Sequence, residues 1–130
     1  MAFSGDSKLI VSCGNDNSIK IWDVAKGSCL KTLEHSNGVR SVAFSSDSKL
    51  IVSGDFDNSI KIWDVAKSSC LKTLEGHSDG ISSVAFSSDS KLIVSCGFDN
   101  SVKIWDVEKG SCLKILKEHS DFVRSVAFSN

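Results

Sequence analysis

The sequence predicts an all-β protein built from a repeated unit, and three observations lead to this. His35, His77 and His119 are evenly spaced, 42 residues apart, and repeats of about 20 to 50 residues are typical of arrays in which one supersecondary unit packs on the next. No segment has the 3.6-residue apolar spacing of a helix. Short runs rich in Val, Ile and Phe are instead separated by turn residues at intervals typical of strands.

Each unit is expected to contain four antiparallel strands, which read VRSVAF, KLIVSG, IKIWDV and CLKTLE. Asp57 and Asn58 mark one hairpin, because Asp and Asn tolerate the positive φ of tight turns. Gly27 and Gly110 are expected to take the left-handed position of the next turn. Ser68 replaces this Gly in the middle unit, at a cost of about 1 kcal/mol. The charged residues of CLKTLE predict an outer edge strand.

The composition argues against several classes of function. Fifteen basic and sixteen acidic residues give a formal charge of -1, so the chain lacks the positive field that a phosphate backbone requires, and no nucleic-acid partner is expected. The aliphatic runs stop at triplets, which predicts neither a signal peptide nor a membrane partner. The five cysteines recur at repeated positions, which favours reduced structural thiols and a cytoplasmic location.

Three IWD tripeptides, a Gly-His pair at Gly76 and His77, and the SVAFSSD tract together resemble the WD40 repeat. The resemblance covers the whole chain, taken as one domain with units at about 1–34, 35–75 and 76–117 and a terminal innermost strand within 118–130. It implies a β-propeller with three four-stranded blades per chain. It also implies a platform for protein or peptide partners.

The resemblance further implies a polar relay in each blade, in which Trp donates to Ser and a His lies between Ser and Asp. The relay residues are His35, Ser53, Asp57 and Trp63 in one blade, and His77, Ser95, Asp99 and Trp105 in the next. These residues are expected to be structural, because a hydrolase needs an exposed nucleophile and oxyanion donors. The three His are not expected to form a metal site, because they lie in different units and none has a Cys or carboxylate ligand at the usual short spacing. No catalytic residue, metal or cofactor is therefore predicted, and the chain is expected not to be an enzyme.

Counting strands leaves the first unit without its innermost strand. Residues 123–129, from Val123 to Ser129, form such a strand with no unit after it. Antiparallel propellers run from about four to eight blades, and an open arc would expose apolar faces and a strand edge. We therefore expect a head-to-tail homodimer, closed as a six-bladed ring, in which residues 123–129 complete the first blade of the other chain.

Closure of this kind divides one relay between two chains, since His119 would join Ser12, Asp16 and Trp22 of the second chain. Two segments compete for the same strand position, because Ala2-Phe3-Ser4 repeats the sequence at 127–129. The C-terminal copy carries the full strand and is expected to fill the position. Residues 1–4 are then expected to be displaced.

The repeat units differ from one another mainly in two loops that the family geometry places on one rim. The candidate partner-binding rim contains Arg40, Phe56, Phe98, Phe122 and Arg124, and Phe and Arg are enriched at protein interfaces. The alternative is that these Phe side chains pack between blades.

The predicted function is a non-catalytic protein-interaction scaffold. A small-ligand or glycan-binding propeller is the second hypothesis; it predicts aromatic pockets in every blade, and Asn15 interrupts the Phe pattern in one of them. The chain is also compatible with a fragment or a designed derivative of a longer WD40 sensor protein, in which case its partners would be set elsewhere.

Overall fold

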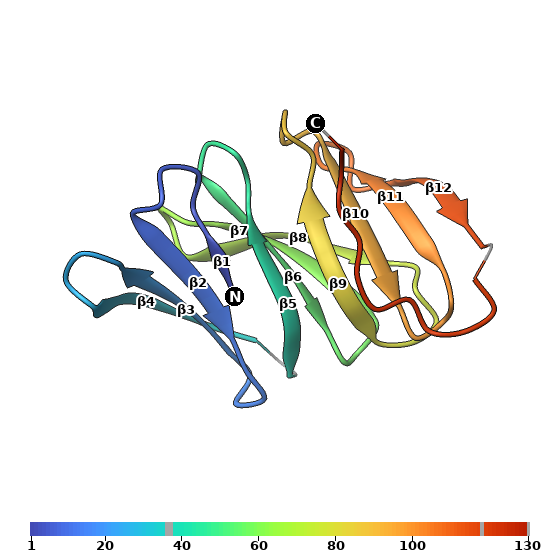
Figure 1. Ribbon diagram of the computed structural model, residues 1–130, viewed down its shortest axis with the longest axis horizontal. Helices are drawn as coiled ribbons and strands as arrows, with labels where there is room; N and C mark the ends of the chain where they lie inside the picture. Colours follow the sequence, from blue (N-terminus) through green and yellow to red (C-terminus); the bar gives the residue numbers. More distant parts are fainter. Residues whose placement is uncertain (36–37, 118, 130) are drawn as a thin grey trace.

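Three four-stranded antiparallel sheets make up the computed structural model, which describes residues 1–35, 38–117 and 119–129 (Figure 1). The first sheet contains β1 (Ala2–Phe3), β2 (Leu9–Cys13), β3 (Ser18–Asp23) and β4 (Ser28–Glu34). The second contains β5 (Val39–Phe44), β6 (Leu50–Asp55), β7 (Ser59–Asp64) and β8 (Ser69–Glu75). The third contains β9 (Ile81–Phe86), β10 (Leu92–Gly97), β11 (Val102–Asp106) and β12 (Cys112–Leu116). The prediction of an all-β repeat fold is confirmed.

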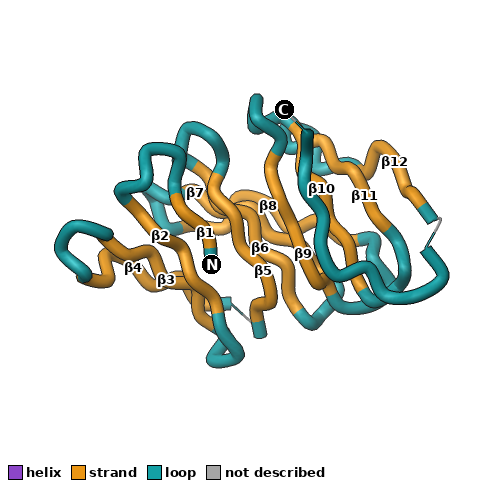
Figure 2. The backbone as a smooth tube through the Cα atoms, in the orientation of Figure 1, coloured by secondary structure: helices purple, strands orange, loops and turns teal. Residues whose placement is uncertain are grey.

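Each sheet is a meander in which strands that follow one another in the chain are hydrogen-bonded neighbours (Figure 2). Each of the nine hairpin turns in the described residues contains one residue with positive φ. These residues form three repeated sets: Ser7, Ser48 and Ser90; Asn17, Asn58 and Asn100; and Gly27, Ser68 and Gly110. Ser68 takes the left-handed conformation at φ 55, as its glycine counterparts do. The predicted turns are thus confirmed, including the strained one.

Two apolar cores lie between consecutive sheets. Alternate residues along a strand point to opposite faces, so Ile51 packs toward the first sheet while its neighbour Val52 packs toward the third. The core between the first and second sheets contains Val11, Ile19, Ile21, Leu33, Val39, Val42, Phe44, Ile51 and Trp63. The core between the second and third contains Val52, Ile60, Ile62, Leu74, Ile81, Val84, Ile93 and Trp105.

The N-terminal residues contradict one expectation, because they are not displaced. Ala2 pairs with Val11 and Phe3 with Ile10, so β1 occupies part of the innermost position of the first sheet. The Ser4 amide then donates to the Leu9 carbonyl at 2.9 Å. A short hairpin holds this pairing together within the single chain, and a short loop is closed at a small entropic cost.

The C-terminal segment forms no strand in residues 119–129, yet it begins where an innermost strand of a further sheet would begin. Val123 is buried, and its amide donates to the Gly97 carbonyl at 3.3 Å. At the junction of the first two sheets, Val39 donates to Gly14 at 3.2 Å in the same way. Figure 1 shows the segment running beside the third sheet. Among the described residues no helix is long and apolar enough to cross a membrane.

Candidate functional site

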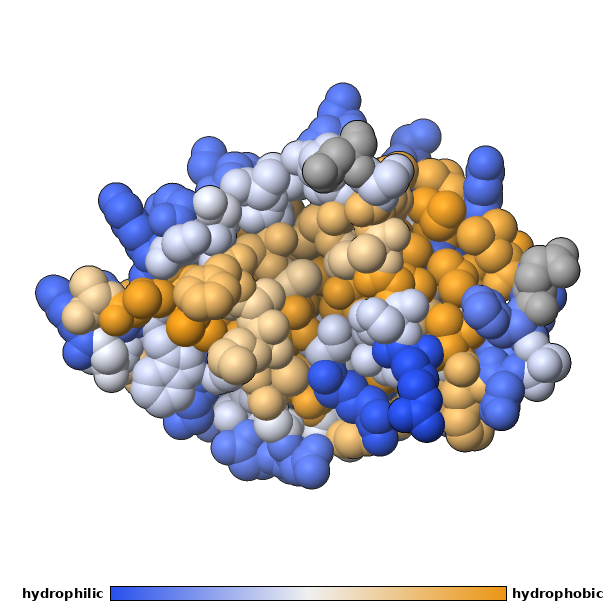
Figure 3. All heavy atoms as spheres, in the orientation of Figure 1, coloured by the Kyte–Doolittle hydropathy of each residue, from blue (hydrophilic) through white to orange (hydrophobic). Residues whose placement is uncertain are grey.

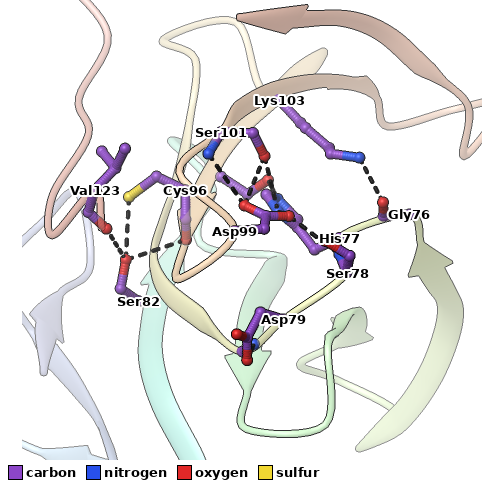
Figure 4. A network of polar contacts seen from close by, with 12 residues as sticks. Gly76, His77, Ser78, Asp79, Ser82, Cys96, Asp99, Ser101, Lys103 and Val123 are labelled. Carbon is purple, nitrogen blue, oxygen red and sulfur yellow. Dashed lines mark hydrogen bonds and ion pairs between the residues drawn. The ribbon is translucent and has the colours of Figure 1, made fainter. Parts of the chain in front are cut away.

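The third sheet carries a continuous polar network around His77 (Figure 4). His77 Nδ1 lies 2.8 Å from Asp99 Oδ2, and its Nε2 lies 2.7 Å from Ser95 Oγ. The Trp105 indole N–H donates to the same Ser95 oxygen at 2.8 Å. Because that oxygen accepts from Trp105, its own proton is available to donate to His77 Nε2, and His77 Nδ1–H then donates to Asp99. All four residues are therefore brought together.

The ionisation of this network favours neutral His77 and ionised Asp99. Burial lowers the pKa of His77 and outweighs the contact with Asp99, which raises it. Burial acts to raise the pKa of Asp99, but hydrogen bonds from Ser101 and His77 bring it to about 2. The Ser78 amide donates to the same carboxylate at 3.1 Å. The Ser95 hydroxyl is fully buried, so this Ser, His and Asp arrangement has no access to a substrate.

The second sheet uses a different carboxylate from the one predicted. His35 Nδ1 lies 3.5 Å from Asp55 Oδ2, whereas Asp57 is exposed. Asp55 is completely buried and accepts from the Asp57 and Ser59 amides at 2.9 and 3.0 Å. The Trp63 indole still donates to Ser53 at 3.0 Å. Asp55 therefore takes the place expected for Asp57.

The length of the incoming loop explains this substitution. His77 follows Leu74 by three residues, but His35 follows Leu33 by only two, so the shorter loop presents its imidazole differently. In the third sheet the position of Asp55 is taken by Gly97, where a side chain would collide with the Gly80 carbonyl. Neither His35 nitrogen has a hydrogen bond to another described residue. The relay in the second sheet is thus looser than that in the third.

The first sheet holds the same polar residues without a histidine. The Trp22 indole donates to Ser12 at 2.9 Å, and the Ser18 hydroxyl donates to Asp16 at 2.7 Å. A hollow of about 340 Å³ lies at these residues, lined by Ser12, Cys13, Gly14, Asn15, Asp16, Ser18 and Lys20. Ser101 and Lys103 are the counterparts of Ser18 and Lys20 in the third sheet. Ser101 contacts His77, and Lys103 donates to the Gly76 carbonyl. The hollow therefore corresponds to the histidine position.

His119 is exposed in the chain and contacts none of the residues predicted as its partners. Its counterparts His35 and His77 are both buried, at 6% and 5% exposure. The predicted set of His119 with Ser12, Asp16 and Trp22 is therefore not assembled within one chain. Its members lie in the first sheet and in the C-terminal segment, at opposite ends of the row of sheets (Figure 1).

The two outer faces of the row of sheets are apolar but uncovered. Leu33 and Leu74, in the outer strands of the first two sheets, are each 2% exposed, whereas their counterpart Leu116 in β12 is 47% exposed. At the other end Trp22 is only partly buried, although Trp63 and Trp105 are buried. Figure 3 shows apolar side chains over the side of the molecule that carries β12. Each end of the row thus exposes the type of face that is covered between sheets.

The five predicted rim residues lie close together. The Arg40 guanidinium carbon is 4.4 Å from the centre of the Phe56 ring and 4.6 Å from that of Phe98. Phe122 meets Phe98 edge to face at 5.0 Å. Phe56, Phe98 and Phe122 belong to neither apolar core. A hollow of about 440 Å³ is lined by Arg40, Ser82, Phe98, Phe122 and Arg124.

The described residues contain no group of three or more His, Cys, Asp or Glu arranged to hold a metal ion. The five cysteines are free thiols, of which Cys29, Cys70 and Cys112 are exposed on the outer strands. The sequence did not indicate the role of Asp55, which depends on loop geometry. It did indicate that Ser12, Asp16 and Trp22 lack a histidine from their own chain, and the hollow lies at Ser12 and Asp16.

Comparison with known proteins shows a similarity along the whole chain. The family model described as "WD domain, G-beta repeat" matches residues 1–23, 27–64, 68–106 and 110–130. The solved structure of U3-55K superimposes on 95% of the chain with a TM-score of 0.89 at 34% identity, and the RRP9 WD40 repeats do so with the same values. The nuclear distribution protein PAC1 of Zygosaccharomyces rouxii is 54% identical over 37 residues.

The chain spans only part of each of these proteins. It covers 40% of the U3-55K chain, 39% of the RRP9 chain and 8% of PAC1, and the PAC1 match includes 28% of this chain. The similarity therefore concerns the repeats.

Proposed function

Because the chain belongs to the WD40-repeat family, we propose that it is a non-catalytic scaffold for protein binding whose ring is closed by two chains. WD40 domains typically bind protein partners, and the chain has three of the four-stranded sheets that form such rings. Three sheets leave both ends of the row open. The observation that carries the proposal is that these ends match the two faces that meet between sheets.

The apolar faces support head-to-tail association. Leu116 at one end corresponds to Leu74, which packs in the core between the second and third sheets. Trp22 at the other end corresponds to Trp105 in the same core. An interface between Leu116 of one chain and Trp22 of another would therefore repeat contacts that already exist twice in each chain. Such an interface uses different surfaces on the two chains, and two copies at the right angle close a ring.

The polar contacts between sheets support the same arrangement. The Lys31 ammonium donates to the carbonyls of Val65 and Ala66 in the second sheet. Lys72 reaches the corresponding carbonyls of the third sheet. Lys114 is the equivalent residue of the third sheet, so in a closed ring it would reach Val24 and Ala25 of the partner. His119 would likewise enter the hollow at Ser12 and Asp16.

The innermost strand of the shared sheet would be composite. In the second sheet Ser41 pairs with Gly54 and Val42 with Ser53, which predicts that Ser125 and Val126 pair with Cys13 and Ser12 of the partner chain. β1 pairs only with Ile10 and Val11. Ser12 and Cys13 of β2 therefore have no strand partner from β1. We therefore revise the expected exchange: residues 123–126 extend β1, and residues 127–129 compete with it.

Light scattering tests the closure. A closed pair of chains has a mass of about 28 kDa, twice the 14.0 kDa of one chain. A folded species of 14 kDa at micromolar concentration would overturn the two-chain ring. An open-ended series of masses would also contradict it, since that is the behaviour of head-to-tail contacts that do not close.

Cross-linking tests the register. In a chain with Cys29, Cys70 and Cys112 changed to Ser, Ser125→Cys should place a thiol opposite the native Cys13 of the partner. Mild oxidation should then give a covalent dimer on a denaturing gel. The matched control is Val126→Cys in the same background, because residue 126 is expected to pair with Ser12, past the bulge, with its side chain on the other face of the strand. Equal cross-linking by both variants would rule out the proposed register.

The five free thiols are compatible with a reducing compartment. We therefore keep the cytoplasm as the proposed location. The fractions of a cell lysate in which the tagged chain appears would test it.

A further inference from the structure

We propose that the rim hollow binds an acidic peptide segment, with Arg40 and Arg124 receiving its carboxylates and Phe98 and Phe122 receiving an apolar side chain next to them. The inference deepens the proposed scaffold function, on which it rests, by giving the chemistry of the partner. It depends on the charge of the lining, on the way Arg40 is held, and on the absence of a carboxylate partner for either arginine among the described residues.

The charged groups that line the hollow all have the same sign. Arg40 and Arg124 are the only arginines in the sequence, and both line this one hollow although they are far apart in the chain. No carboxylate lines it, and no described Asp or Glu forms an ion pair with either guanidinium. Both side chains are exposed. The chain as a whole has a formal charge of -1, so this local positive charge is not a general property of its surface.

Arg40 is held in place before any ligand arrives. Its guanidinium lies between the Phe56 and Phe98 rings, at 4.4 and 4.6 Å from their centres. Stacking between two rings orients the planar group and leaves its N–H edge available for a carboxylate. A side chain that is ordered in advance loses less conformational entropy on binding, which favours affinity. Lys at this position would keep the charge but could neither stack between the rings nor form a bidentate pair with a carboxylate.

The aromatic part of the hollow selects the neighbouring ligand group. Phe122 is 55% exposed and meets Phe98 edge to face at 5.0 Å. These rings offer an apolar surface beside the two positive charges, so the ligand that satisfies both is a carboxylate within one or two residues of an aliphatic or aromatic side chain. A peptide provides this combination. A nucleic acid would offer phosphates and base stacking instead, and the experiment below includes it as a competing outcome.

Fluorescence anisotropy with defined probes tests the site. The probes are a labelled hexapeptide Glu-Leu-Glu-Phe-Asp-Glu, its amide counterpart Gln-Leu-Gln-Phe-Asn-Gln, and a labelled hexauridylate. We expect the acidic peptide to bind at least tenfold more tightly than the amide peptide and than the oligonucleotide. Equal affinity for both peptides would overturn the proposal, and so would tighter binding of the oligonucleotide.

Substitutions locate the binding. Arg40→Lys should weaken the binding of the acidic peptide about tenfold. Phe98→Leu should also weaken this binding, and its thermal unfolding curve shows whether the fold is retained. Lys67→Ala is the matched control, because Lys67 is an exposed cation at the outer hairpin, away from the hollow. If Lys67→Ala weakens binding as much as Arg40→Lys, the attraction is unspecific and the site is wrong.

The outcome is distinguishable from failure of the closed ring. The hollow is lined by residues of one chain, so the peptide is expected to bind whether the mass is 14 or 28 kDa. A closed ring that binds none of the probes would refute the site alone. A single-chain species that binds the acidic peptide would refute the closure alone.

Discussion

The first and third sheets carry the same Ser, Asp, Lys and Trp residues, but only the third holds a histidine among them. The Trp-to-Ser hydrogen bond is present in both, at 2.9 Å for Trp22 and 2.8 Å for Trp105. This bond joins two strands of one sheet and forms without help from outside. The histidine arrives from the loop that follows the preceding sheet. The comparison shows that the polar network is in part a property of one sheet and in part a contact between two.

The second sheet gives an intermediate case. Its histidine is present and buried, but one residue fewer in the loop places it 3.5 Å from a carboxylate instead of 2.8 Å. The contact between sheets thus differs together with the loop length and with the residue at the position of Asp55 and Gly97.

The largest expected effect breaks the complete network and compares it with the incomplete one. His77→Ala removes the imidazole contacts with the Ser95 hydroxyl and the Asp99 carboxylate and leaves a buried cavity, and should lower the free energy of unfolding by about 3 kcal/mol. Urea denaturation measures this, and the loss should not depend on protein concentration. His119→Ala should act through association, so its effect should grow as the protein is concentrated. Equal, concentration-independent losses would contradict the distinction between the two sheets.

The next effect tests the exchange of carboxylates in the second sheet. Asp55→Ala removes the acceptor of the Asp57 and Ser59 amides, and should cost about 2 kcal/mol in urea denaturation. Asp57→Ala changes an exposed residue, so it should stay within about 0.5 kcal/mol of the unchanged chain. A larger loss for Asp57→Ala would restore the carboxylate predicted from the family pattern.

Acidification should weaken the contacts of both buried histidines. The pKa values of His35 and His77 are lowered from 6.5 in the folded chain, chiefly by burial, so below pH 6.5 the unfolded chain binds more protons. Their contribution to stability is thus complete above pH 6.5 and is lost as the pH falls toward the folded pKa values. Thermal unfolding between pH 8 and 5 should show this decrease. His77→Gln should make it shallower; an unchanged pH dependence would exclude His77 as its source.

The smallest effect concerns a turn outside the network. Ser68 has φ 55 where Gly27 and Gly110 have 64 and 69. Ser68→Gly should therefore raise the free energy of unfolding by about 0.5 to 1 kcal/mol. The reverse change, Gly27→Ser, should lower it by a similar amount, and urea denaturation of both variants provides the measurement. A loss of stability in Ser68→Gly would mean that the turn is not strained.

The regular parts of this fold could be predicted because each depends on residues close together in the chain. Strand alternation, the Asp and Asn of the second hairpin, and the glycine of the third are all local signals. The pairing of Ala2 and Phe3 with β2 could not be decided in the same way. Two segments of equal sequence compete for that position, and the outcome depends on which loop is shorter and on how many chains are present.

The site was predictable to a different extent. Ser53, Ser95, Trp63 and Trp105 pair within their sheets, so their positions follow from strand register. The family pattern indicated Asp57 and not Asp55, because it takes the loop length as constant. The stacking of Arg40 on two rings joins residues 40, 56 and 98 across two sheets, and spacing along the chain predicts only that they lie on one rim.

A ring closed around a two-fold axis would contain two copies of the rim hollow. Rotation about the axis of the channel would place both copies of the hollow on the same side of the disc. A partner with two acidic segments could then occupy both, and the second binding event would be intramolecular, at an effective concentration of about millimolar for a short flexible linker. A ring of two modest sites would retain such a partner far longer than either site alone. Dilution into single chains would release it, so the chain's own concentration would regulate its binding.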